Sequence, residues 1–423
     1  MSEWSTLKLS TVAQLITKGA TPTTYGHEYT ESGIAFVRVN NILENGQLDL
    51  SKSLFIGKTT HALFSRSQLH VNDVLVSIAG SIGRTTVVDA AVLPANCNQA
   101  VALIRLEPDF DPSYVARLLA SNIGRAQITA ATVQLAQANF SLKQVGDLEF
   151  NFPPHSEQKS IAKVIDCIDM TICQTEAIIE KLKLVKQGLQ HDLLTRGIDA
   201  NGELRPPQSQ APQLYKDSPL GWIPMEWDAL QFSTLAQYTN GNTFDAGSWR
   251  SQGLPIIRIQ NLNGSNNFNY FDGPVNSRWH VLPGDLLFAW SGQRGISFGP
   301  RIWSGPNGVL NQHIFKVIEK YGVISKDFLF EVLRFRQSVI EDSAHGFKDS
   351  FLHVTRGELG AVFAGIPLPA EQSMIVTRIA VFEAKLNEER AILAKNLALK
   401  TGLMDDLLTG SVRVTQLLDT VDA

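Results

Sequence analysis

The sequence predicts a mixed α/β (α+β) protein in which two pseudo-twofold-related globular domains are joined by two long helices forming an antiparallel coiled coil. Three observations support this expectation. The chain repeats itself at a spacing of about 214 residues, each repeat closes with a long apolar run at a 3.5-residue period, and the rest of each repeat consists of short β-type segments. A chain of 423 residues is long enough for two or three domains.

The repeat is clearest in short motifs that occur once in each half of the chain. Two motifs near the end of each repeat recur 214 positions apart, and two further upstream recur at spacings of 213 and 220. The four pairs are Asp192–Thr195 with Asp406–Thr409, Glu157-Gln158 with Glu371-Gln372, Asn98-Gln99 with Asn311-Gln312, and Ile34–Asn41 with Leu254–Asn261. One part of each repeat is therefore fixed in length and the other varies in its loops, as expected for two copies that address similar but non-identical targets.

The part of fixed length is helical. Ten positions spaced alternately by four and three residues run from Ile161 to Leu193, and eight are apolar; the matching run from Ile375 to Leu407 has seven. Polar exceptions fall at matching places, such as Lys186 and Lys400. The narrow stripe predicts two helices of roughly 38 residues, ~57 Å each, packed antiparallel on one another. The competing interpretation is a long amphipathic helix packed on its own domain.

The remainder of each repeat, 1–152 and 222–366, predicts a mixed α/β domain. The expected strands are Ile34–Val39, Val74–Ile78, Val101–Leu106, Leu254–Ile259, Leu286–Trp290 and Ile314–Ile318. Short helices are expected at Pro112–Asn122 and Lys326–Ser338. The polar, proline-rich segment Gly197–Pro219 predicts a linker.

Composition narrows the class of protein. A hydrophobic fraction of 44% and a charged fraction of 18% exclude a disordered or collagen-like chain. A net charge of −4 argues against a protein that holds nucleic acid by charge alone. Cys97, Cys167 and Cys173 are too few for a disulfide framework and lack zinc-site spacing, so we expect small core residues. Without a signal peptide or an 18-residue apolar run, a cytoplasmic protein is expected.

Motifs of catalysis are missing or defective. Gly57-Lys58-Thr59 resembles the end of a phosphate-binding loop, but Lys52 occupies the place of the required glycine. Asn151–Pro154 resembles the Asn-Pro-Pro-aromatic motif of amino-methyltransferases with the wrong spacing, and its counterpart Gly365–Pro369 lacks the asparagine. The sequence also shows no histidine spacing typical of metal sites and no duplicated catalytic triad. We therefore expect a non-catalytic chain without a metal or cofactor of its own.

Side chains suited to binding DNA recur in both repeats. Gly80–Arg84 and Ser291–Gly295 follow matching strands, and Arg, Asn and Gln follow two others, where they could contact phosphates or base edges. Each motif alone has a plain alternative as a turn or a strand cap. The candidate DNA-binding residues are Arg38, Asn40, Asn41, Ser81, Arg84, Asn98, Gln99, Gln134, Asn139, Arg258, Gln260, Asn261, Ser291, Gln293, Arg294, Asn311, Gln312 and Lys348. Of these, Arg84, Arg294 and Lys348 are the favoured phosphate or guanine contacts.

Over essentially its whole length the chain resembles the specificity (S) subunits of type I restriction–modification systems. The resemblance is carried by the Glu-Gln helix starts in Pro153–Gln158 and Pro369–Gln372 and by the paired Asp-Leu-Leu-Thr helix ends. Leu220–Trp227 resembles the family's lead-in to its second domain, and Val71–Leu75 and Leu282–Leu286 resemble its recurrent pattern before a strand.

The resemblance implies a division of labour. Each globular domain would be a target recognition domain that reads one half of a bipartite site in double-stranded DNA, and the coiled coil would set the gap and dock methyltransferase (M) subunits, two in number. The M subunits would carry S-adenosylmethionine, and restriction (R) subunits would use ATP and Mg²⁺. The expected boundaries are 1–155 and 222–370 for the domains, 156–197 and 371–412 for the helices, 198–221 for the linker and 413–423 for the tail.

Two other function classes remain open on the residues alone. A structural or protein-interaction scaffold with two β-rich binding domains would also need the coiled coil, and salt-dependent, sequence-selective DNA binding would distinguish it. A self-sufficient nuclease or methyltransferase would need the motifs found missing above.

Overall fold

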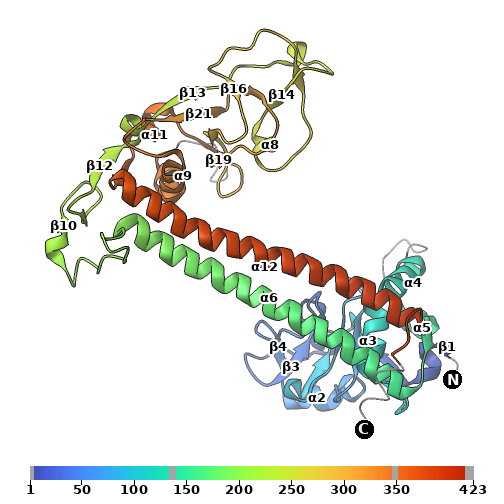
Figure 1. Ribbon diagram of the computed structural model, residues 1–423. Helices are drawn as coiled ribbons and strands as arrows, with labels where there is room; N and C mark the ends of the chain where they lie inside the picture. The colour runs from blue at the N-terminus through green and yellow to red at the C-terminus, as the bar shows by residue number, and fades with distance from the viewer. Residues whose placement is uncertain (1–3, 133–139, 345–350, 415–423) are drawn as a thin grey trace. The chain divides into compact units, whose positions relative to one another are not determined.

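A computed structural model describes residues 4–132, 140–344 and 351–414, and the chain divides into two compact units. Unit 1 comprises 1–177 and 391–423, and unit 2 comprises 178–390. Two 41-residue helices are shared between them: α6 (His155–Thr195) begins in unit 1 and ends in unit 2, and α12 (Pro369–Thr409) does the reverse (Figure 1). Each unit therefore holds half of each helix.

The described residues of unit 1 form three small sheets. The strand orders are β2-β8-β5-β6, β4-β3-β7 and β1-β9. Their bounds are β1 Ser5–Lys8, β2 Ala13–Lys18, β3 Ile34–Val37, β4 Leu54–Ile56, β5 Val74–Ser77, β6 Thr85–Val87, β7 Ala95–Cys97, β8 Val101–Leu106 and β9 Glu149–Phe152. The short helices are α1 Leu9–Val12, α2 Lys58–Leu63, α3 Pro112–Ala120, α4 Asn122–Thr132 and α5 Leu142–Asp147.

Unit 2 repeats this arrangement with additions. Its sheets are β13-β21-β17-β19, β15-β14-β20-β16 and β12-β23, with the pairs β10-β11 and β18-β22. The bounds are β10 Tyr215–Lys216, β11 Ile223–Pro224, β12 Asp228–Gln231, β13 Ala236–Asn240, β14 Leu254–Ile257, β15 Tyr270–Phe271, β16 His280–Val281, β17 Leu286–Ala289, β18 Ser291–Gln293, β19 Gly299–Ile302, β20 Gly308–Leu310, β21 Ile314–Glu319, β22 Phe351–His353 and β23 Phe363–Ile366. The helices are α7 Phe232–Leu235, α8 Ile259–Leu262, α9 Lys326–Phe335, α10 Gln337–Ser343 and α11 Arg356–Ala361.

The predicted duplication is therefore confirmed at the level of topology. In both units one sheet contains a single parallel strand pair, β3 with β7 and β14 with β20. The four-stranded sheets β2-β8-β5-β6 and β13-β21-β17-β19 have the same order, and each helix start is preceded by an equivalent strand, β9 or β23.

The antiparallel packing of the two helices is confirmed inside each unit. In unit 1, Asp169 of α6 lies 2.6 Å from Lys400 of α12, and Glu157 earlier on α6 pairs with Arg413 just beyond α12. Residue numbers thus rise along one helix as they fall along the other. In unit 2, Lys186 of α6 pairs with Glu383 of α12 in the same sense. All twenty positions of the predicted stripes are buried or partly buried.

The lysines that interrupt the stripes take part in matching ionic clusters. In unit 1, Asp169 forms ion pairs with Lys400 and with Arg117 of α3, which lies 2.7 Å away. In unit 2, Glu383 forms ion pairs with Lys186 and with Arg334 of α9, which lies 3.3 Å away. Each cluster joins both long helices to the globular part of its unit, which explains why a lysine can occupy a stripe position.

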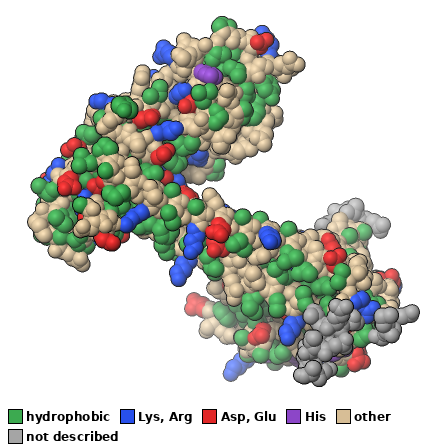
Figure 2. All heavy atoms as spheres, in the orientation of Figure 1, with side chains coloured by type: hydrophobic (Ala, Val, Ile, Leu, Met, Phe, Trp, Pro, Cys, Tyr) green, Lys and Arg blue, Asp and Glu red, His purple; other side chains and the backbone are tan. Residues whose placement is uncertain are grey.

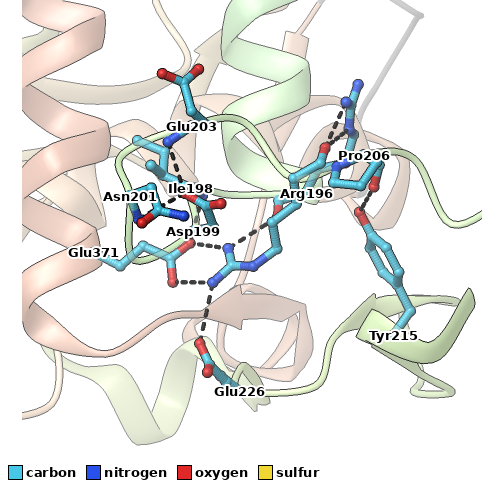
Figure 3. Close-up of polar contacts among 10 residues, drawn as sticks. Arg196, Ile198, Asp199, Asn201, Glu203, Pro206, Tyr215, Glu226 and Glu371 are labelled. Carbon is cyan, nitrogen blue, oxygen red and sulfur yellow. Dashed lines mark hydrogen bonds and ion pairs between the residues drawn. The ribbon is translucent and has the colours of Figure 1, made fainter. Parts of the chain in front are cut away.

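Each helix start is also held by a buried glutamate. Glu371 at the start of α12 accepts from Arg205 and from the backbone N–H of Ile198, just beyond the end of α6. Glu226 also accepts from the Arg205 guanidinium, and Figure 3 shows the Glu371 and Glu226 carboxylates from which these contacts run. In unit 1, both carboxylate oxygens of Glu157 accept from Arg413 at 2.7 Å. We call these contacts the unit 2 junction and the unit 1 junction.

The two junctions share a tryptophan and a glycine. Gly197 after α6 and Gly410 after α12 both have positive φ, 66° and 78°. A Cβ on Gly197 would lie 2.5 Å from the Trp227 ring, and one on Gly410 would lie 3.2 Å from the Trp4 ring. Glycine therefore both ends the helix and leaves room for the indole of Trp227 or Trp4.

The glutamines of the repeated Glu-Gln pairs are fully buried links. Gln158 accepts from the N–H of Asp111 and donates to the carbonyl of Pro153. Gln372 accepts from the N–H of Ser325 and donates to the carbonyls of Val323 and Pro367. Asp111 and Ser325 are the residues that cap α3 and α9. Each glutamine thus fixes a long helix to a short one.

Several expectations are corrected. The long helices have 41 residues rather than roughly 38. α6 begins directly after Pro154 and α12 begins at Pro369, because proline is compatible with the first helical turn. The helix predicted at Pro112–Asn122 ends at Ala120, where Ser121 leaves the helical conformation, and α4 follows. Cys97 is buried as expected, but Cys167 and Cys173 are exposed on α6, so the prediction of core cysteines is wrong for these two.

Two strands stop two residues earlier than predicted. Strand β3 ends at Val37 rather than Val39 because Asn41 Oδ1 accepts from the N–H of Arg38 and starts a tight turn. Strand β14 ends at Ile257 because Asn261 does the same to Arg258. The segment predicted as a linker packs within unit 2, where Tyr215 is buried and donates to the carbonyl of Pro206.

Candidate nucleic-acid interface

The parallel strand pairs bring most of the candidate residues together. Val37 lies opposite Cys97 in the β3–β7 pair, and Ile257 lies opposite Leu310 in the β14–β20 pair. Because parallel strands end at the same edge, the residues that follow each pair are neighbours. We call these the unit 1 edge (Arg38–Asn41 with Asn98 and Gln99) and the unit 2 edge (Arg258–Asn261 with Asn311 and Gln312).

Glycine allows a third strand to approach each edge closely. A Cβ on Gly19, after β2, would lie 1.7 Å from the carbonyl oxygen of Cys97, and one on Gly241, after β13, would lie 2.2 Å from that of Leu310. The N–H of Gly19 donates to the carbonyl of Asn98 at 3.1 Å. Both edges are therefore platforms of closely packed backbone.

At the unit 1 edge, exposed and buried candidates separate. Asn40 and Gln99 are exposed, and Arg38 is half-buried. Asn41 is buried, and its amide is engaged with the N–H of Arg38 at 2.9 Å and the carbonyl of Asp49 at 2.9 Å. Asn98 caps its own turn by accepting from the N–H of Ala100. Asn40, Gln99 and Arg38 are thus the side chains available to a ligand here.

The turn after β5 lies beside this edge and lines a hollow. Arg84 donates to the carbonyl of Ile42 at 3.1 Å and lies 3.5 Å from Glu44. Exposed Ser81 and half-buried Arg84 line a cavity of about 740 Å³, together with Arg125 of α4 and Lys400 of α12. Lys400 is paired with Asp169, whereas Arg125 is exposed.

The unit 2 edge repeats the backbone pattern with different side chains. Asn261 is buried and donates to the carbonyls of Ser265 and Asn267, and Gln260 is exposed. The Arg258 guanidinium lies 4.4 Å from the centre of the Trp249 ring. Asn311 and Gln312 are half-buried.

The turn after β17 differs most between the units. Ser291 is buried in β18, where it pairs with His353, while Gln293 and Arg294 are exposed. Arg294 lies 3.5 Å from Glu341 and 3.4 Å from Asp342 of α10. Buried Phe298 and the Gln337 side chain, which donates to the Phe298 carbonyl, also pack in this region. The candidates Gln134, Asn139 and Lys348 lie outside the described residues.

The sequence did not single out the aromatic residues beside the unit 2 edge. Trp290 follows β17 directly, with ring centroids 5.2 Å from His313 and 6.0 Å from His353. Burial lowers the pKa of the His313 imidazole, and the neighbouring His353 lowers it further. The sequence did show an aromatic residue at the end of a predicted strand, but Trp290 was interpreted as part of that strand. Arg125 and Lys400 at the unit 1 cavity were likewise missed as site residues.

The electrostatics agree with the sequence-level balance. Figure 2 shows lysine, arginine and acidic side chains interspersed over the visible face, without a large patch of one sign. Within the described ranges, no cluster of three or more His, Cys, Asp or Glu side chains could hold a metal ion. None of the helices described is both long and apolar enough to cross a lipid bilayer.

Comparison with known proteins supports the resemblance. Residues 1–184 match the family model described as the type I restriction modification DNA specificity domain. A Methanocaldococcus jannaschii protein named as the type I restriction enzyme MjaX specificity subunit is 21% identical over 97% of this chain and 94% of its own length. The Escherichia coli type I restriction enzyme EcoBI specificity subunit is 25% identical over 39% of this chain and 34% of its own.

Solved structures share the fold. A chain from a structure of a type I R-M system, described for its complex assembly and conformational transition, superimposes with a TM-score of 0.61 at 15% identity, covering 97% of this chain and 99% of that one. The type I restriction-modification S subunit from M. genitalium gives a TM-score of 0.55 at 14% identity, covering 96% of each chain. These structures show that the fold is shared, and the family model together with the named relatives confirms the resemblance seen in the sequence.

Proposed function

We propose that this chain is the DNA-specificity subunit of a type I restriction–modification complex and that each unit reads one half of a bipartite site. The observation that carries the proposal is the duplicated edge. Both units end a parallel strand pair in Arg-x-x-Asn and Asn-Gln, hold it by a glycine contact, and surround it with different side chains. Two identical platforms with different surroundings suit two different DNA words.

The residues proposed to contact DNA are the exposed or half-buried ones. In unit 1 these are Arg38, Asn40, Ser81, Arg84 and Gln99. In unit 2 they are Arg258, Gln260, Gln293, Arg294 and Gln312. Buried Asn41 and Asn261 are left out because their amides are engaged with backbone groups. Half-buried Asn98 and Asn311 are also left out, because their side-chain oxygens accept from backbone N–H groups. With a net charge of −4, the chain depends on partner subunits for much of the phosphate attraction.

The long helices are proposed to fix the gap between the two words and to dock M subunits. The support for docking is a second apolar surface, outside the buried stripes, at matching positions. In unit 2 it comprises Ile178 and Val185 of α6, 44% exposed each, and in unit 1 it comprises Ile392 and Leu399 of α12, 40% and 50% exposed. Two equivalent surfaces suit two M subunits.

The remaining partners follow from this assignment. The M subunits would supply S-adenosylmethionine and the methyl transfer, and R subunits would supply ATP- and Mg²⁺-dependent steps. This chain would then contribute recognition without chemistry, in the cytoplasm where host DNA is modified.

The direct test is to co-express the chain with its companion methyltransferase subunit in a host free of DNA methylation and to sequence modified bases. We expect a split motif of two short words around a fixed gap, present only when this chain is present. Co-purification of the subunits without any motif would contradict DNA recognition. A failure to co-purify would favour an interaction scaffold instead.

A second test addresses the gap. Deleting residues 174–180 together with 389–395 removes one heptad from each helix, with the two segments facing each other in the observed register. Seven residues shorten a helix by ~10 Å, or about three base pairs. We expect the gap to shorten and both words to persist, whereas an altered word would contradict a pure spacer role.

A further inference from the structure

Unit 2 contains an aromatic group that has not been given a function. Trp290 lies between His313 and His353, with ring centroids at 5.2 and 6.0 Å, and against Phe315 at 5.9 Å. These rings come from the end of β17, the start of β21 and the end of β22, so three separate segments converge on one place. We call Trp290, His313 and His353 the ring cluster.

Hydrogen bonds fix the ring cluster to the unit 2 edge. The indole N–H of Trp290 donates to the carbonyl of Gln312 at 3.0 Å. The Gln312 side-chain oxygen accepts from the hydroxyl of Thr243, and its amide nitrogen lies 3.2 Å from Nε2 of His313. The cluster is therefore built into the platform rather than attached to a free loop, and its geometry is set before any ligand arrives.

An arginine completes the group. Arg356 donates to Asn240 Oδ1 at 2.9 Å, and its guanidinium lies 5.9 Å from the centre of the Phe315 ring. Asn240 in turn donates to the carbonyl of Gln312 at 3.4 Å. Arg356 and His353 are exposed, and Trp290 and His313 are half-buried. The surface thus offers flat rings and a positive charge side by side.

The equivalent place in unit 1 has no such rings among the described residues. The carbonyl of Trp290 accepts from the N–H of Val354, and the carbonyl of Ile78 accepts from that of Phe140, each at 2.9 Å. Ile78 therefore stands where unit 2 has Trp290. By the Asn-Gln alignment, Ala100 stands in place of His313. The backbone frame is shared, and the side chains on it differ in kind.

We propose that the ring cluster and Arg356 determine which DNA word unit 2 recognises. A half-buried indole edge and the exposed His353 ring provide apolar contact of the kind that selects a thymine methyl. A fixed guanidinium suits a guanine edge or a backbone phosphate. This inference rests on the proposed function, since it names the residues through which one of the two edges would select its sequence.

The test uses the full chain co-expressed with its companion methyltransferase subunit, with modified bases sequenced genome-wide. The variants are His353→Ala, Arg356→Ala and Trp290→Leu, and Tyr321→Ala is the matched control because it removes an aromatic side chain that is 99% exposed in the same unit. His353 and Arg356 are exposed, so their variants keep the test valid if Trp290→Leu fails to fold.

We expect one word of the motif to relax or change at one or two positions, while the other word and the gap stay as they were. Methylation at the original word should fall about 5- to 100-fold, the effect of losing one good base contact, and Tyr321→Ala should leave it unchanged. An unchanged motif for His353→Ala and Arg356→Ala, or a change in both words, would overturn this inference and leave the proposed function standing. If the unaltered chain directs no split motif, the proposed function fails, and the inference fails with it.

Discussion

The two units have equivalent structural contacts around their long helices but different side chains at their exposed edges. Both hold a long helix by a buried glutamate, fix it through a buried glutamine and join it to the globular part by a lysine–carboxylate–arginine cluster. At the edges, unit 1 has a hollow beside Ser81 and Arg84, whereas unit 2 has packed rings beside Gln312. The contacts that hold the long helices are therefore separate from the side chains proposed to select DNA, and either set can change without the other.

The largest expected effect concerns the two junctions, which differ in exposure. The Arg205 and Glu371 side chains are 8% and 9% exposed, whereas the Arg413 side chain is 33% exposed. Glu371→Gln should lower the free energy of unfolding of unit 2 by about 3 kcal/mol, because it leaves a buried guanidinium without its main partner. Urea denaturation of the full chain, with hydrogen exchange of 196–227 as the local readout, measures this.

Glu157→Gln is the matched variant in unit 1. It should cost less, because Arg413 can turn toward water when its partner is lost. Equal losses in the two units would mean that exposure does not govern the strength of the junctions.

The next effect concerns the buried glutamines. Gln372→Ala should destabilise unit 2 by about 2 kcal/mol, since it strands the N–H of Ser325 and two carbonyls in the interior. Gln158→Ala strands the N–H of Asp111 and one carbonyl, so its cost should be smaller. Thermal unfolding of the two variants side by side checks the order, and a reversed order would show that water replaces the lost bonds in unit 2.

A smaller effect should separate charge from packing in the ionic clusters. Burial raises the pKa of Glu383, but Lys186 and Arg334 outweigh it and hold that pKa below its ordinary value. Glu383→Gln should cost about 1 kcal/mol, and the double change Lys186→Met with Glu383→Leu should recover that loss by extending the apolar stripe. A double variant less stable than the single one would show that the ion pair contributes more than packing can replace.

The smallest effect on the free chain should come from the exposed apolar positions of the helices. Ile392→Ser with Leu399→Ser in unit 1, or Ile178→Ser with Val185→Ser in unit 2, should change stability by under about 0.5 kcal/mol each. Each pair should nevertheless remove one of two bound M subunits, measured by the mass of the complex in solution. Retention of both M subunits in each variant would exclude these surfaces as docking sites.

Much of the fold was predictable because local sequence patterns determine its strands and long helices. The six strands expected from apolar runs are present with ends shifted by at most two residues, and the 3.5-residue stripe predicted both long helices and their packing. The partners of the repeated motifs were not predictable. Glu371 and Arg205 are separated by 166 residues and Glu157 and Arg413 by 256, and no local pattern links them.

The candidate site was predictable in its location more than in its chemistry. Parallel pairing of β3 with β7, and of β14 with β20, brought the polar residues after these strands to shared edges. Asn41 and Asn261 illustrate the limit, because an amide suited to a base edge is equally suited to capping a backbone turn. The ring cluster was missed because its members come from three segments that only the fold assembles.

The two junctions differ in how the chain connects their residues. At the unit 2 junction, Trp227 follows the end of α6 after a short stretch of chain. At the unit 1 junction, Gly410 and Arg413 contact Trp4, which lies near the opposite end of the described chain. The two junctions therefore bring equivalent residues together by different routes along the chain. A circular permutant that links Arg413 to Trp4 and opens near the exposed Ser209 should fold to the same structure. By the same logic, a single repeat would complete its junctions by pairing with a second copy of itself.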